Sequence, residues 1–427
     1  MKIPLLKVYA AAMFIASAGC STYVPVAAGD NLAYLYGKGA AAIRLDARVY
    51  EPAAMRTTLY FKLRTADLLY KGTGGGGPYH ARVMMHYEAW PATGKGDLLD
   101  SASTLVKDQR ADQTEDRELI GSMVVNVAGD QPYLLRITAH DLNRDAQSTV
   151  LARVERGMAT HRDEFMRTAA NGLPYFDDRV QPGAMAHVRA DQFAGQALFA
   201  AHYPASQKLP APVFAEVPSV ALGTTPDSTF FVHVDTDGTF ALRTGSSGYY
   251  HFRPDTSSME GYTLFIADGS YPLVASAADM AGPLRYITSL KEWDAISTAK
   301  DQRKEVEKFW VNAAGSRDRA REAIAGYYGR VETANRHFTS CMEGWKTDRG
   351  LVHIIFGTPT SIRRGSDGNT ETWTYGEETN LMSLVFEFVR KPGPFCDNEL
   401  VLLRNQGLKS AWYRNVESWR NGRILQN

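Results

Sequence analysis

A chain of 427 residues is too long for a single hydrophobic core, so we expect about two to four domains. Lysine and arginine together number 47, as do aspartate and glutamate, and no long run carries one sign of charge. This balance argues against nucleic acid or an anionic membrane surface as the main partner. Aromatic residues make up 11% of the chain, which is typical of β-rich domains.

Residues 1–19 have the order of a secretory signal peptide. Lys2 and Lys7 flank the start of an apolar run that covers residues 5–18. The run is shorter than the roughly 20 residues that a helix needs to span a bilayer. A charged start followed by a short apolar run therefore predicts a cleaved targeting segment.

The end of this segment resembles the lipobox of bacterial lipoproteins. Small residues directly precede Cys20, and the resemblance implies that Cys20 becomes the lipidated first residue of the mature protein. It also implies the outer membrane, because Ser21 and not aspartate follows. No acidic cluster follows either, which favours a periplasm-facing protein. The alternative is an ordinary signal peptide with an incidental cysteine. Residues 20–41 are small and nearly uncharged, which predicts a tether.

Residues 42–160 predict a first β-sandwich of immunoglobulin-like type. Apolar and polar residues alternate from Ile43 to Tyr50, and about five further runs show the same pattern between turn residues. The glycine-rich stretch 72–77 lacks the Gly-Lys-Ser/Thr ending of a phosphate-binding loop, and no helical pattern follows it. It is therefore interpreted as a hairpin loop.

Residues 161–288 predict a second β-rich domain. An apolar strand there ends in the sequence Asp235-Thr-Asp237-Gly238-Thr239, which resembles the nucleophile signature of haloacid-dehalogenase-type phosphotransferases. That chemistry needs a helix after the loop. An alternating strand follows instead, so Asp237 and Gly238 predict a two-residue hairpin turn.

Residues 289–427 predict a helical segment followed by an α+β domain. One amphipathic helix is expected over 301–312, and a longer one begins after the candidate N-cap Ser316. A closing helix is expected over 410–419. The overall expectation is a multidomain, mainly β protein, with two β-sandwich-like (immunoglobulin-like) domains followed by helices and a C-terminal α+β domain with an antiparallel meander.

The sequence Gly344-Trp-Lys-Thr-Asp-Arg-Gly350 is the most specific motif of the chain. The apolar, β-branched run 351–356 after it predicts a buried strand, which Gly357 and Pro359 end. Three more strands are expected, so the domain would be a four-stranded antiparallel meander. Their ranges are 371–375, 381–389 and 400–403.

This motif resembles the GWxTD domain of bacterial envelope proteins. The resemblance begins on the preceding helix, at Tyr327, Arg330 and Asn335, and fades near Trp419. It implies no established reaction, no catalytic residues and no cofactor. The order Gly-x-Pro, then Trp-x-Tyr, is also similar to small α+β lipoproteins of the outer-membrane β-barrel assembly machine. Those proteins carry a helix where this sequence predicts the strand 351–356.

The motif residues have a structural and a chemical interpretation. Trp345 is expected to be a buried plug that seats the loop, the alternative being an exposed recognition residue. Asp348 and Arg349 are expected to brace the loop, because no histidine or second carboxylate lies nearby in sequence to complete an acid–base pair. No catalytic residue is therefore assigned. The residues predicted to be structural are Gly344, Trp345, Thr347, Asp348, Arg349, Gly350, Gly357 and Pro359.

Cys341 and Cys396 remain after Cys20 is set aside. In an oxidising envelope compartment they predict a disulfide, whose loop closure is worth about 4 kcal/mol. Two buried thiols are the alternative. A metal site with His337 and His353 is a third interpretation, but nothing local enforces it, and no metal is assigned.

The leading functional hypothesis is a non-enzymatic, lipid-anchored outer-membrane scaffold or adaptor in a secretion or outer-membrane assembly complex. Its expected partners are the membrane, through the lipid, and an envelope protein, with no nucleic acid. One alternative is a glycan- or peptide-binding lipoprotein that uses exposed aromatics such as Trp90, Tyr249 and Tyr250. Another is an envelope hydrolase whose site is assembled from several domains.

Overall fold

The structure is a computed structural model of the chain. It describes residues 31–33, 43–72, 74, 78–92, 96–111, 116–156, 160–206, 208–216, 225–365, 369–377, 379–391, 393, 395–396 and 398–425. Among these residues, none of the helices is both long enough and apolar enough to cross a membrane.

The first domain is an antiparallel β-sandwich, as the alternation predicts. Alternate residues of its strands are buried because they face the opposite sheet, as in β7, where every second residue from Tyr133 to Asp141 lies in the core. One sheet has the order β1 (Leu45–Ala53), β2 (Arg56–Arg64) and β6 (Glu118–Val125). The other contains β3 (Lys71–Gly72), β4 (Tyr79–Pro91), β5 (Asp100–Arg110), β7 (Tyr133–Asp141) and β8 (Ala146–Val154).

The second domain is a smaller pair of sheets around an aromatic core that includes Phe165, Phe252 and Tyr262. One sheet has the order β10 (Arg179–Val180), β16 (Tyr262–Ile266), β15 (Gly248–Arg253), β12 (Ala197–Pro204) and β13 (Ser228–His233). The other has the order β14 (Thr239–Arg243), β11 (Met185–Arg189) and β9 (Met166–Thr168).

The predicted hairpin at Asp237 and Gly238 is wrong in one respect. The turn forms, since the Gly238 amide donates to the Asp235 carbonyl at 2.9 Å and Gly238 has φ +77°. However, β13 pairs with β12 and β14 pairs with β11, so the turn carries the chain from one sheet to the other. Each strand finds its partner elsewhere in the sandwich, which local turn chemistry does not encode.

The C-terminal domain packs helices against one sheet. Its helices begin at Ala277, inside the range 161–288 expected for the second β-rich domain. Asp301 and Ser316 cap the N-termini of α3 and α4, as the sequence predicts for Ser316. The helices are α1 (Ala277–Leu284), α2 (Leu290–Ser297), α3 (Gln302–Ala314), α4 (Arg317–His337), α5 (Asp348–Phe356) and α6 (Lys409–Arg420).

The predicted strand 351–356 is wrong, because these residues belong to helix α5. Thr347 is its N-cap, with its hydroxyl accepting the Gly350 amide at 3.0 Å, and Asp348 occupies the first turn. All nine residues of α5 are buried. A helix buried on every side has no polar face, so its sequence lacks the 3.6-residue period and is easily mistaken for a buried strand.

The four-stranded meander is present with a different first strand. Its order is β17 (Ser361–Arg364), β18 (Thr370–Tyr375), β19 (Leu384–Arg390) and β20 (Leu400–Leu402). Strand β17 takes the place predicted for residues 351–356. With α5 in front of Gly357, the helix expected from the assembly-machine lipoproteins is present, and the difference noted from the sequence disappears.

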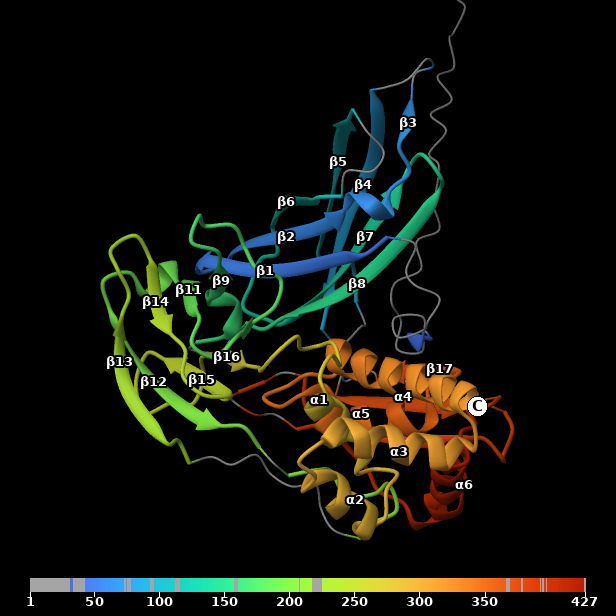
Figure 1. The fold of residues 1–427 in the computed structure, drawn as a ribbon. Helices are drawn as coiled ribbons and strands as arrows, with labels where there is room; N and C mark the ends of the chain where they lie inside the picture. The colour runs from blue at the N-terminus through green and yellow to red at the C-terminus, as the bar shows by residue number, and fades with distance from the viewer. Residues whose placement is uncertain are drawn as a thin grey trace, which may run out of the picture.

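The three domains contact one another (Figure 1). The first packs on the second through β1, which lies against the short 3-10 helices Arg162–Glu164 and Asp191–Phe193. It reaches the third through β8, where Leu151 packs on the C-terminal core. Residues 31–33 lie beside β17, since the Leu32 amide donates to the Ile362 carbonyl at 2.8 Å and Leu32 is buried. This part of the range 20–41, which was expected to be a tether, therefore packs on the C-terminal domain.

Candidate functional site: the cleft between the domains

A cleft of about 1730 Å³ lies where the three domains meet. The first domain contributes residues 43–48 of the β1 region and 147–150 of β8. The second contributes residues 176–179 and the start of β16. The third contributes the C-terminal half of α4. The volume exceeds the roughly 300–1,000 Å³ of typical small-molecule pockets.

Charged side chains of both signs line this cleft. Arg44 and Asp46 come from the first domain, Asp177 and Arg179 from the second, and Arg336 from α4. Several of them are solvated, as shown by the half-exposed side chain of Arg336, whose guanidinium lies 3.5 Å from Glu332. Such a lining suits a polar or polypeptide ligand better than an apolar one.

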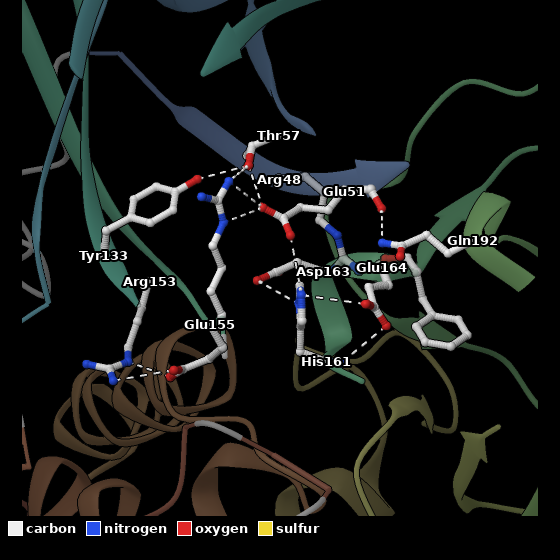
Figure 2. Close-up of polar contacts among 12 residues, drawn as sticks. Arg48, Glu51, Thr57, Tyr133, Arg153, Glu155, His161, Asp163, Glu164 and Gln192 are labelled. Carbon is white, nitrogen blue, oxygen red and sulfur yellow. Dashed lines mark hydrogen bonds and ion pairs between the residues drawn. The ribbon is translucent and has the colours of Figure 1, made fainter. Parts of the chain in front are cut away.

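Glu51 is the centre of a buried polar network at the joint between the first two domains (Figure 2). Its Oε1 accepts the Thr57 hydroxyl at 2.5 Å and Arg156 Nε at 3.0 Å. Tyr133 donates its hydroxyl to Thr57 at 3.0 Å. The Glu51 backbone carbonyl accepts the side-chain amide of Gln192 at 2.9 Å. The network therefore ties both sheets of the first domain to the second domain.

His161 joins this network and lines the cleft. Its Nε2 lies 3.3 Å from Glu51 Oε2 and 3.7 Å from Glu164, and its Nδ1 lies 4.0 Å from Asp163. Burial alone would lower the pKa of His161, but the contact with Glu51 and the charges of Asp163 and Glu164 raise it. Burial also raises the pKa of Glu164. A protonated imidazole among carboxylates is the charge state that this geometry favours.

A second ion pair completes the same joint. Arg48 Nη1 lies 2.5 Å from Asp178, and its Nη2 donates to the Phe165 carbonyl at 3.0 Å. Tyr262 donates its hydroxyl to the other Asp178 oxygen at 2.5 Å. Burial favours the neutral form of Asp178, but the Arg48 charge holds its pKa below the usual range. Buried pairs of opposite charge thus hold the first two domains together.

We expect His161→Gln to destabilise the protein more at about pH 6 than at about pH 9. The pKa of His161 is higher in the folded chain, so its protonated form stabilises the fold. That contribution is fully present below the unfolded value of 6.5 and is lost as the pH rises through the folded-state pKa. Urea unfolding at both pH values measures it, with His140→Gln as a more exposed control. Equal losses at the two pH values would contradict the assigned charge state.

The Gly-Trp-Lys-Thr-Asp-Arg-Gly motif packs helix α5 against α4. A Cβ atom on Gly344 would lie 2.0 Å from the Ala334 carbonyl oxygen, and one on Gly350 would lie 1.9 Å from the Gly344 oxygen. Only glycine fits at these two contacts, because the clashing atoms are backbone. Trp345 is partly buried and packs on Gly282 of α1 and on Tyr286, whose hydroxyl donates to the Trp345 carbonyl at 2.7 Å.

The charged pair of the motif points inward. Asp348 accepts the Leu402 amide at 2.8 Å and lies 2.6 Å from Arg404, which in turn donates to the Ala211 carbonyl at 3.0 Å. Arg349 donates to the Asn398 carbonyl at 2.7 Å. These contacts join α5 to β20, to the loop before β20 and to the loop between β12 and β13 of the second domain. Asp348 and Arg349 therefore hold α5 against the segments that it contacts.

The motif and the cleft are separate parts of the molecule. Of the eight motif residues named from the sequence, Gly357 alone lines the cleft. It has φ +88°, and the Arg330 guanidinium would lie 2.9 Å from a Cβ atom there. Arg330 itself donates to the Ile354 and Ile355 carbonyls at 3.2 Å and so caps the end of α5. The bend at Trp345 therefore does not form the floor of the cleft.

Cys341 and Cys396 pack in one aromatic cluster with Tyr203, Tyr249 and Phe395. Both are thiols in the structure. Their proximity leaves the disulfide as a prediction for the oxidising compartment. We expect alkylation of both cysteines in the unfolded, envelope-derived protein to require prior reduction, measured by mass spectrometry. Full alkylation without reductant would contradict the bridge.

The structure also bears on the expected exposed aromatic residues and on the possible metal site. Tyr249 and Tyr250 are buried, so the expectation of exposed aromatics at these positions is wrong; β15 is a central strand whose residues Gly248 to Phe252 are all covered. Within the part of the chain that the structure describes, no group of three or more His, Cys, Asp or Glu side chains is placed to hold a metal ion. Cys20 and the predicted signal peptide lie outside the described residues.

The Glu51 network has no recognisable signature in the sequence. Its members come from six separate segments, and only the neighbouring residues 161, 163 and 164 carry a local signal, a run of charges at the start of the second domain. Arg156 and Thr57 look like ordinary strand-end residues. Their role depends on the packing of the two sheets of the first domain.

The fold thus defines a multidomain, mainly β protein with a C-terminal domain of helices on an antiparallel meander. Residues 248–421 match the GWxTD domain family, so the chain carries a GWxTD domain. No protein of curated function matches the sequence at a significant level.

Solved structures resemble parts of the chain only weakly. A Bacteroides uniformis β-glucuronidase is 11% identical over 32% of this chain and 16% of its own length, with a TM-score of 0.19. Red sea bream transglutaminase is 8% identical over 54% and 31%, with a TM-score of 0.20. BcpA, the major pilin subunit of Bacillus cereus, is 10% identical over 52% and 63%, with a TM-score of 0.15. Likenesses of this strength carry no inference about activity.

Proposed function

We propose that the protein is a lipid-anchored outer-membrane scaffold or adaptor, which holds a segment of an envelope partner in the cleft between its domains. The observation that carries the proposal is the cleft, to which all three domains contribute a wall. The GWxTD motif also supports a non-enzymatic role, because its charged residues Asp348 and Arg349 make structural contacts within the fold.

The cleft suits a polypeptide segment because two strand edges border it. β1 and β8 are edge strands, each with one neighbour in its sheet, and both contribute residues to the lining. An edge strand offers backbone groups to which an extended segment can pair. Arg44, Asp46 and Arg336 add charges of both signs, which would select the register of such a segment.

The envelope process in the proposal is secretion or outer-membrane assembly. Helix α5 before Gly357, followed by the meander, gives the order of elements expected from the resemblance to the small lipoproteins of the assembly machine. This order supports the assembly role, while the identity of the partner is left to experiment.

A pull-down from detergent-solubilised outer membrane tests the adaptor. The tagged full-length chain should recover a membrane protein in stoichiometric amount. A chain recovered as a monomer that binds only sugars or short peptides would contradict the proposal.

The anchor is tested by Cys20→Ser. Without the acylated cysteine, the chain should move from the outer-membrane fraction to the soluble periplasmic fraction, because the lipid supplies the membrane affinity. Cys396→Ser is the matched control, since it removes a cysteine from the folded part and should leave the protein in the membrane. A Cys20→Ser chain that stays fully in the membrane fraction would contradict lipid anchoring at this residue.

An envelope hydrolase is the second candidate, because Cys396, His337 and His353 all line the cleft. Burial lowers the pKa of His337 to about 4, with the Arg336 and Arg349 charges acting in the same direction. Asn398, which would orient a catalytic base in such a site, instead donates to the backbone carbonyls of His337 and Thr339 at 3.1 and 3.0 Å. Rapid labelling of Cys396 by iodoacetamide at neutral pH would favour this candidate over the adaptor.

A further inference from the structure

We infer that the end of the GWxTD sheet that carries Leu381 and Met382 lies against the phospholipid surface of the membrane. This inference rests on the proposed lipid anchor at Cys20 and adds a second contact to it. The two residues precede β19 and are almost completely exposed, with relative exposures of 101% and 85%. Isolated exposed apolar residues are common, but two adjacent, fully exposed ones at the tip of a sheet indicate a surface that another molecule covers.

The segment that presents them is held in a defined conformation. The Met382 amide donates to Asn380 Oδ1 at 2.9 Å, and the Ser383 hydroxyl donates to the Glu377 carbonyl at 2.7 Å. Val385, the second residue of β19, is 45% exposed near the same end of the sheet. Leu403 is also about half exposed, and its amide pairs with the Glu387 carbonyl at 2.8 Å, which places it beside the middle of β19.

The N-terminal segment enters the fold at this same end. Asn31 donates its side-chain amide to the Thr360 carbonyl at 2.9 Å and accepts the Ile362 amide at 3.1 Å. Thr360 in turn accepts the Gly376 amide at 3.1 Å, and Gly376 is the first residue after β18. Asn31 and the turn that carries Leu381 are therefore connected through Thr360.

The 11 residues from Cys20 to Asn31 limit the distance between this end of the sheet and the membrane surface. Cys20 and Asn31 are 11 residues apart, and a fully extended chain spans about 3.6 Å per residue, so Asn31 lies within about 40 Å of the lipid attachment. An acyl anchor becomes stable when a second apolar or basic contact supplements it. Glu377 adds a negative charge beside the tip, so the contact would rest on apolar burial and would prefer a neutral lipid surface.

Photo-crosslinking in vesicles tests the contact. The acylated full-length chain is reconstituted into phosphatidylcholine vesicles with p-benzoylphenylalanine in place of Leu381 or of Met382. The control places the same group at Phe231, which is 66% exposed on β13 of the second domain. We expect at least about tenfold more lipid adduct at the two tip positions than at the control, which corresponds to about 1.4 kcal/mol of preference.

The outcomes separate the contact from the anchor. The intact mass of the extracted chain reports directly whether Cys20 is acylated. An acylated chain with no lipid adduct at Leu381 and Met382, with equal adduct at Phe231, or with adducts only to a second copy of the chain overturns the contact alone. An unacylated chain that gives no lipid adduct overturns both the anchor and the contact.

Discussion

Replacing Asp348 by alanine should lower the free energy of unfolding of the C-terminal domain by about 3–5 kcal/mol. Asp348 and Arg404 are both buried, and the substitution leaves the Arg404 guanidinium and the Leu402 amide without their carboxylate. A buried charge that loses its partner is among the most damaging changes in a folded protein. Urea unfolding followed by tryptophan fluorescence measures the effect, since six of the seven tryptophans lie at or beyond residue 293.

Asp318→Ala is the matched control. Asp318 also lies in the first turn of a helix, where it pairs with Arg321 at 3.5 Å, but its side chain is 95% exposed. Exposed pairs contribute little, so this variant should lose less than about 1 kcal/mol. If Asp348→Ala left the unfolding curve unchanged while a partner or substrate was lost, the structural role of Asp348 would be refuted.

Gly350→Ala should destabilise the domain by at least about 3 kcal/mol or prevent it from folding. The new Cβ atom would lie 1.9 Å from the Gly344 carbonyl oxygen and 3.1 Å from the Trp345 Cα, so backbone and not a flexible side chain has to move. Helix α5 would be pushed off the loop that its N-cap Thr347 holds. Thermal unfolding of the purified chain gives the measurement.

The control for this prediction is Gly329→Ala on helix α4. No atom lies within 4 Å of a Cβ built there, and the position is helical. Alanine should therefore stabilise the helix by about 0.5–1 kcal/mol. A Gly350→Ala protein as stable as the Gly329→Ala protein would show that α5 can be displaced without cost, which contradicts the close packing of the motif.

Much of the architecture can be predicted from the sequence because its signals are local. Alternation along β7 predicts a half-buried strand, and the caps Asp301 and Ser316 mark helix starts. Helix α5 escapes prediction because burial on every side removes the polar face, and Val352, Ile354 and Ile355 favour a strand by local preference. Thr347, a favourable N-cap residue, is the local feature of the sequence that indicates a helix here.

The candidate site is less predictable than the fold. The cleft is assembled from segments as far apart as Arg44 and Arg336, and no spacing in the sequence connects them. The Glu51 network has the same origin, because Arg156 reaches Glu51 only after the two sheets of the first sandwich have packed, and His161 reaches it from the start of the second domain. The motif that stabilises the C-terminal domain can therefore be recognised in the sequence, whereas the residues of the cleft can be identified only from the structure.

The central claim is that the cleft binds the partner while the motif holds the domain together. It is tested most directly by comparing Arg336→Glu with Arg321→Glu in the outer-membrane pull-down. Both residues lie on α4 and each pairs with a neighbouring carboxylate at 3.5 Å, but Arg336 lines the cleft and Arg321 does not. We expect Arg336→Glu to reduce partner recovery by about tenfold or more and Arg321→Glu to retain it. Equal recovery by the two variants would contradict binding in the cleft.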